Sequence, residues 1–175
     1  MKYLSLKESL IAALFTSLTV IGSYLIIPLP ISPVPITLQT FFVLMAGLIG
    51  GKSIGVLSQL VYLLIGIIGV PVFASGLGGI GVLLSPTGGF LIAFPIAAYI
   101  SGTKNNISDV KFLLTKLIFA KIIIYSFGVI FMIVFWDFNI ISALTAGVLP
   151  FIPGDTIKII LLIIIKRRLR NINYL

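Results

Sequence analysis

Two oppositely charged residues, Asp155 and Lys158, stand at the start of the last apolar stretch of the chain, PFIPGDTIKIILLIIIKRR at residues 150–168. The preceding Pro150, Pro153 and Gly154 indicate a turn, so the sequence predicts that Asp155 is the N-cap of a helix. There its carboxylate would accept hydrogen bonds from free N–H groups of the first turn. Lys158 would lie one turn deeper, about 4.5 Å along the helix axis and on nearly the same face.

A lysine inside an apolar segment is a candidate functional residue, because a charge near the centre of a bilayer costs about 2.5 to 3.5 kcal/mol. A helix N-terminus together with Lys158 suits the carboxylate of a small ligand. Ionised Asp155 accepts hydrogen bonds only, so it suits N–H donors such as those of a urea or an amide. The alternative is a mutual ion pair that caps the helix, but that interpretation leaves Lys158 without a role.

Two further stretches supply candidate ligand contacts. Four prolines stiffen residues 28–35, and polar side chains follow at once in Thr37, Gln39 and Thr40. The stretch 69–90 is rich in glycines, which let backbone approach a ligand closely; a flexible linker explains that composition equally well.

Catalytic chemistry has few candidates in this chain. There is no His, no Cys and only four acidic residues, so thiolate nucleophiles, imidazole bases and the commonest zinc ligands are excluded, and we predict neither a catalytic nor a metal site. The stretch GGKS at 50–53 resembles the end of a phosphate-binding loop, but the glycine that such a loop requires is Ala46 here.

The elements that must position these residues are membrane helices. The chain is 59% hydrophobic and 9% charged, whereas soluble domains carry about 25% charged residues. We therefore predict an all-α membrane protein that forms a single domain over residues 1–175. Proline, glycine and charge divide it into six transmembrane segments, at 6–27, 37–49, 53–70, 87–101, 110–135 and 156–169, and Pro95 predicts a kink in the fourth.

The basic residues predict the orientation of these segments. With the N-terminus inside, ten of the twelve Lys and Arg residues lie on the inner side, and the outer connections 28–36, 71–86 and 136–153 contain none. The inner set is Lys2, Lys7, Lys52, Lys104, Lys111, Lys116, Lys166, Arg167, Arg168 and Arg170. Both termini are thus expected in the cytoplasm and the ligand pocket at the outer face. Membrane lipid accounts for the net charge of +8 without nucleic acid.

Two other features have alternative interpretations. We expect Lys121, about three turns into the fifth segment, to extend its stem toward the inner surface, with a functional role as the alternative. Ala13 and Ser17 form a small-xxx-small pattern that permits close helix approach. Spacing alone favours internal packing there over contact with a membrane partner.

Three stretches carry a resemblance to a known family: PVPITLQTFFVLMAGLIGG at 33–51, GVPVFASGLGGIGVLLSPTGGFLIAF at 69–94, and LPFIPGDTIKIIL at 149–161. In order and spacing they resemble the BioY family, the biotin-specific S components of energy-coupling factor (ECF) transporters. The resemblance implies six helices with cytoplasmic termini. It also implies that Asp155 and Lys158 of the GDxxK box bind biotin, whose ureido group and carboxylate match the ligand inferred above.

The resemblance extends to further positions. Thr37 and Gln39 would be secondary contacts, from an outer loop that covers the site. Ser75, or backbone near Gly76, would take the place of a polar side chain that the family often carries in the glycine-rich loop. The first helix of S components often meets the coupling protein through alanine-spaced residues, which implies a partner contact at Ala13 and Ser17.

The function implied is high-affinity biotin capture and uptake across the cytoplasmic membrane by a multi-pass subunit that needs no cofactor. ATP would be hydrolysed by two cytosolic ATPase subunits joined through an EcfT-like transmembrane coupling protein. An S component for another vitamin and an intramembrane enzyme are the alternatives, and a channel is disfavoured because no series of charged residues crosses the membrane.

Overall fold

The computed structural model describes residues 5–103 and 109–169, and it is mostly helical. Four of its helical stretches are long and apolar enough to cross a membrane: Leu6–Tyr24, Gln39–Ile67, Val110–Trp136 and Ile140–Leu169. Gly88–Ser101 is a shorter apolar stretch. The prediction of a helical membrane protein is confirmed to the extent that the chain is mostly helical and has four helices able to cross a membrane. Three of the basic residues assigned to the inner side, Lys2, Lys104 and Arg170, lie outside the described residues.

Helix α1 (Leu6–Tyr24) begins with a capping box formed by Ser5 and Glu8. It ends earlier than predicted, because the chain turns into a short antiparallel hairpin of β1 (Ile26–Ile27) and β2 (Ile36–Thr37). One face packs against α2, where the Thr16 hydroxyl donates to the carbonyl of Ser58 at 2.9 Å. Ala13 and Ser17 lie on the exposed face, so the preference for internal packing at these two residues was wrong.

Helix α2 (Gln39–Ile67) reverses direction at Gly51, whose φ of 83° is non-helical. A Cβ added to Gly55 would lie 2.7 Å from the Cα of Gly47, although eight residues of continuous helix span about 12 Å. The chain therefore folds back on itself at the turn predicted between the second and third segments. The buried Lys166 donates to the carbonyl of Leu48 at 2.8 Å, near the end of the first half of α2.

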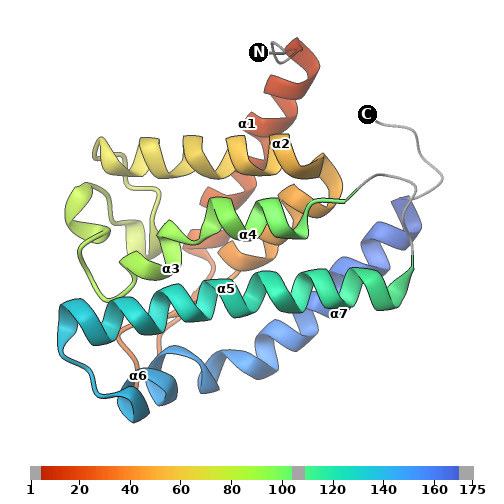
Figure 1. Cartoon of the computed structure of the whole chain (residues 1–175). Coiled ribbons are helices and arrows are strands. Elements are labelled where there is room, and N and C mark those ends of the chain that lie inside the picture. Colours follow the sequence, from red (N-terminus) through yellow and green to blue (C-terminus); the bar gives the residue numbers. More distant parts are fainter. Residues whose placement is uncertain (1–4, 104–108, 170–175) are drawn as a thin grey trace.

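The fourth predicted segment contains two helices, α3 (Gly88–Ile92) and α4 (Phe94–Ser101), with a break at Ala93. This break, two residues before Pro95, confirms the predicted kink. Helix α4 lies between α2 and α5 (Val110–Trp136), as Figure 1 shows. The packing is tight, because a Cβ on Gly47 would lie 2.0 Å from the carbonyl oxygen of Ala98.

The last part of the chain differs from the prediction in two ways. Helix α6 (Ile140–Gly147) forms within the predicted outer connection, where Asn139 caps it by accepting from the Ser142 amide at 2.8 Å. A 3₁₀ turn, η3 (Leu149–Phe151), then leads directly into α7 (Ile152–Leu169). Asp155 thus lies inside the first turn of α7, and its prediction as the N-cap was wrong because the chain is already helical before it.

Three of the connecting segments, 28–36, 71–86 and 136–153, lie together at one end of the molecule. The segment between α2 and α3, with the 3₁₀ turns η1 (Ala74–Gly76) and η2 (Ile80–Val82), lies at the same end as α6 in Figure 1. The Ser32 hydroxyl donates to the carbonyl of Ala146 at 2.7 Å, and the Trp136 indole to that of Leu84 at 3.0 Å. The C-terminal end of α4 and the N-terminal end of α5 lie at the opposite end.

Candidate ligand-binding site

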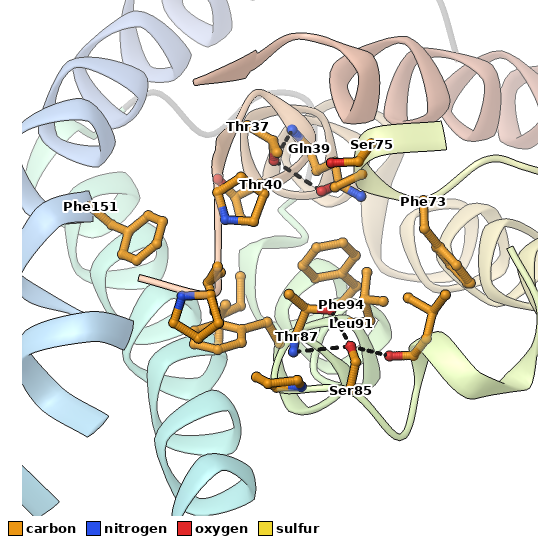
Figure 2. Close-up of a pocket in the computed structure, with 18 of the residues that line it drawn as sticks. Thr37, Gln39, Thr40, Phe73, Ser75, Ser85, Thr87, Leu91, Phe94 and Phe151 are labelled. Atoms are coloured by element: carbon orange, nitrogen blue, oxygen red, sulfur yellow. Dashed lines mark hydrogen bonds between the residues drawn. The ribbon is translucent and has the colours of Figure 1, made fainter. Parts of the chain in front are cut away.

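A pocket opens among these gathered segments, between the start of α2, the loop 73–87, α3, α5 and α7 (Figure 2). Its volume is about 250 Å³, just below the range of about 300 to 1,000 Å³ typical of small-molecule sites. Aromatic side chains form much of its wall: Phe73, Phe90, Phe94, Tyr125 and Phe151. The size suits a small molecule with an apolar part, not a peptide or a lipid.

Asp155 is the centre of a buried charged cluster that lines this pocket. Its Oδ1 accepts from Nζ of Lys158 at 2.9 Å. Its Oδ2 forms an ion pair with Lys121 and accepts a hydrogen bond from the Tyr125 hydroxyl. Side chains of α5 and α7 are thus joined through the carboxylate of one residue that is 5% exposed.

Lys158 has all three of its N–H donors engaged. Besides Asp155, it donates to the carbonyl of Thr37 at 2.8 Å and to the Thr40 hydroxyl at 3.2 Å. It therefore fixes α7 against the start of α2, far away in the sequence. The mutual ion pair considered from the sequence does form, but it belongs to a pocket wall and does not cap a helix.

Lys121 was predicted to extend toward the inner surface, and that prediction was wrong. Lys121 is 4% exposed, lines the pocket and pairs with Asp155. Its Nζ also lies 5.5 Å from the ring centre of Tyr125. The four-residue spacing places Lys121 and Tyr125 on one helix face, a sequence signal for a polar patch inside an apolar helix that sequence analysis missed.

Thr37 and Gln39 belong to a second polar group at the pocket, as Figure 2 shows. The Thr37 hydroxyl donates to Oε1 of Gln39 at 3.0 Å. Nε2 of Gln39 donates to the Tyr62 hydroxyl, which donates to the carbonyl of Val72 at 3.0 Å. The start of α2 is thereby tied to the loop that closes the other side of the pocket.

The glycine-rich loop is built as a pocket wall. Ser75 lines the cavity with a left-handed φ of 62°, while Gly76, with a φ of 69°, is outside the lining. The Gly79 amide donates to the carbonyl of Gly66 at 2.7 Å, so the loop is pinned to the end of α2. Ser85 and Thr87, which sequence analysis did not select, face the cavity with their hydroxyls 2.8 Å apart (Figure 2).

Apolar helices of membrane length around a small pocket with buried charges of both signs define a class: an integral membrane protein that binds a small polar molecule. The comparison with family models narrows that class, since the model of the BioY family matches residues 1–173. The chain belongs to the BioY family.

Curated relatives match this chain over nearly their whole length. The chain is 43% identical over 165 residues to "Probable biotin transporter BioY" of Pyrococcus horikoshii, covering 94% of this chain and 97% of the relative. It is 36% identical over 168 residues to "Biotin transporter BioY" of Thermotoga maritima, covering 95% and 98% respectively. These relatives and the four apolar helices identify a multi-pass protein of the cell membrane.

A solved structure shares the fold. It is a crystal structure of the S component for biotin from an ECF-type ABC transporter. The TM-score is 0.86 at 31% identity, and the match covers 94% of this chain and 90% of that one. The arrangement of helices described above is therefore that of an S component.

Proposed function

We propose that this chain captures biotin in the pocket around Asp155 and takes part in its uptake as the substrate-binding subunit of an ECF transporter. The buried Asp155–Lys158–Lys121 cluster, in a chain of the BioY family, is the observation that carries this proposal. The chain is accordingly a transporter subunit, not an enzyme.

The chemistry of biotin matches the pocket. Its ureido group offers N–H donors and a carbonyl acceptor, its side chain ends in a carboxylate, and its ring carbons and sulfur are apolar. Asp155 can accept from N–H groups, and Lys121 can donate to an oxygen. Phe73, Phe94 and Phe151 provide apolar surface around the cavity.

The cluster limits how the ligand binds. Asp155 and Lys158 contact each other directly, so they act on one part of the ligand and cannot hold its two ends separately. Thr37 and Gln39 lie beside them, and Ser75 offers its hydroxyl from the glycine-rich loop. The backbone of Gly76, which does not line the cavity, would act by shaping that loop.

The proposed topology has six crossings, with both termini in the cytoplasm and the pocket open to the outer face. Three facts support it. The chain reverses within α2 at Gly51, Lys and Arg are absent from the connections 28–36, 71–86 and 136–153, and these connections surround the pocket.

Transport requires partners. We propose an EcfT-like transmembrane coupling protein and two cytosolic ATPase subunits, so that ATP is used by the partners and this chain carries no cofactor. Ala13 and Ser17, on the exposed face of α1, would permit close approach of a partner helix. After capture the chain would reorient in the membrane and release biotin inward.

A ligand panel tests the assignment against an S component for another vitamin. The purified chain in detergent is titrated with biotin, desthiobiotin, riboflavin and thiamine by calorimetry. We expect tight binding of biotin and none of riboflavin or thiamine. Binding of another vitamin in preference to biotin would refute the proposal.

A further inference from the structure

We propose that Lys121 makes the pocket selective for the anionic form of its ligand, so that biotin is bound in preference to neutral derivatives that share its rings. This inference rests on the proposed biotin site and assigns a specificity-determining residue within it.

The described residues that line the pocket carry one excess positive charge. Lys121, Asp155 and Lys158 are the charged members of that lining, which gives two positive charges and one negative. The chain has only three other acidic residues. Glu8 forms the capping box of α1, Asp109 caps α5 by accepting from the Lys111 amide, and Asp137 lies at the other end of α5, so none of them lines the cavity.

Lys121 is the source of this excess. Lys158 and Asp155 neutralise each other, and Lys158 has its three donors engaged by Asp155, Thr37 and Thr40. Nζ of Lys121 forms an ion pair with Oδ2 of the same carboxylate, but it makes no hydrogen bond of good geometry with any described residue. Apart from this ion pair with Asp155, no acceptor among the described residues engages the Lys121 ammonium, which is therefore able to donate to a ligand.

An unbalanced buried charge is unfavourable in an apolar environment, and a bound anion relieves it. The field of Lys121 extends across a cavity of this size because aromatic walls screen it poorly. The ligand's carboxylate gains from that field whether it touches Lys121 or lies further along the pocket. A neutral ligand of the same shape gains nothing from it.

A purely structural role for Lys121 makes a different prediction. If the lysine served only to hold Asp155 in place, its removal would weaken binding of charged and neutral ligands by the same factor. The ratio of the two affinities, not either affinity alone, therefore separates the two roles.

The experiment measures the dissociation constants of biotin and of its neutral amide, biotinamide, for the unmodified chain, Lys121→Met and Lys121→Arg. We expect the unmodified chain to prefer biotin at least tenfold. The preference should fall to about threefold or less in Lys121→Met and be restored in Lys121→Arg. The exposed Lys111→Met, on the same helix, is the matched control and should keep the full preference.

The outcomes are distinct. Equal affinity of the unmodified chain for biotin and biotinamide overturns the inference, even if Lys121→Met fails to fold. A preference that survives intact in folded Lys121→Met overturns it as well. Failure of the unmodified chain to bind biotin at all refutes the proposed function, on which this inference depends.

Discussion

Asp155 accepts hydrogen bonds from Lys158 and Tyr125 and forms an ion pair with Lys121, so one carboxylate organises the pocket. Breaking a buried ion pair by removing one partner is costly, because the remaining charge is left without compensation. The cluster is therefore sensitive to each of its members. Lys121 and Tyr125 contribute from α5 and Lys158 from α7.

Tyr125→Phe tests the neutral member of the cluster. The substitution removes one hydrogen bond to Asp155 without changing the charge. Because a hydrogen bond to a charged group contributes about 1.5 to 3 kcal/mol, we expect biotin affinity to fall about tenfold or more. Calorimetric titration measures it, with exposed Tyr99→Phe as control. Unchanged affinity in Tyr125→Phe would show that the hydroxyl does not shape the site.

At the scale of elements, the sequence predicted the long apolar helices and those breaks that one glycine or proline causes. The turn at Gly51 and the break before Pro95 are of this kind. Helix α6 was missed because its eight mostly apolar residues next to a loop do not differ in pattern from a hydrophobic connection.

The candidate site was predicted only where its residues belong to a local sequence motif. Asp155, Lys158, Thr37, Gln39 and Ser75 were selected from local motifs, and all line the pocket. Lys121 was misplaced because its partner is 34 residues away, on another helix, and only the packing of α5 against α7 brings them together. Which phenylalanines form the walls depends on the same packing.

The contact between α2 and the glycine-rich loop predicts a destabilising substitution. A Cβ at Gly66 would lie 2.0 Å from the ring of Phe73, which lines the pocket. We expect Gly66→Ala to lower stability by about 1 to 3 kcal/mol and to weaken biotin binding, because Phe73 must move. Thermal unfolding in detergent measures the first effect. Gly81→Ala is the control and should behave like the unmodified chain, because open space surrounds Gly81. Unchanged stability and binding in Gly66→Ala would show that the contact with Phe73 is unimportant.

The exposed face of α1 yields a prediction that separates binding from transport. Trp at Ala13 or Ser17 would obstruct close approach of a partner helix, while the pocket is lined by other elements. We expect Ala13→Trp and Ser17→Trp to bind biotin normally and to lose uptake in cells that contain the partner subunits. Ile118→Trp, exposed on α5, is the control and should keep uptake. Normal uptake by both α1 variants would place the partner elsewhere.

At the scale of the whole molecule, the proposed orientation can be tested with single cysteines, since the chain has none of its own. Ile31, 73% exposed in the hairpin, is assigned to the outer side, and exposed Lys52 to the inner side. In intact cells a membrane-impermeant maleimide should label Ile31→Cys and not Lys52→Cys. In permeabilised cells both variants should be labelled. Labelling of Lys52→Cys and not of Ile31→Cys in intact cells would show that the orientation is the reverse of the proposed one.

The role of the charged cluster in biotin binding is measured by titrating biotin into the purified chain, beside Lys158→Ala, Asp155→Asn and the exposed control Lys111→Ala. We expect tight binding by the unmodified chain and the control. Affinity should fall by at least about 2 kcal/mol, roughly 30-fold, in Lys158→Ala, because a buried charged partner is lost, and Asp155→Asn should also bind more weakly. Undiminished binding by both pocket variants, or none by the unmodified chain, would show that this cluster is not a biotin site.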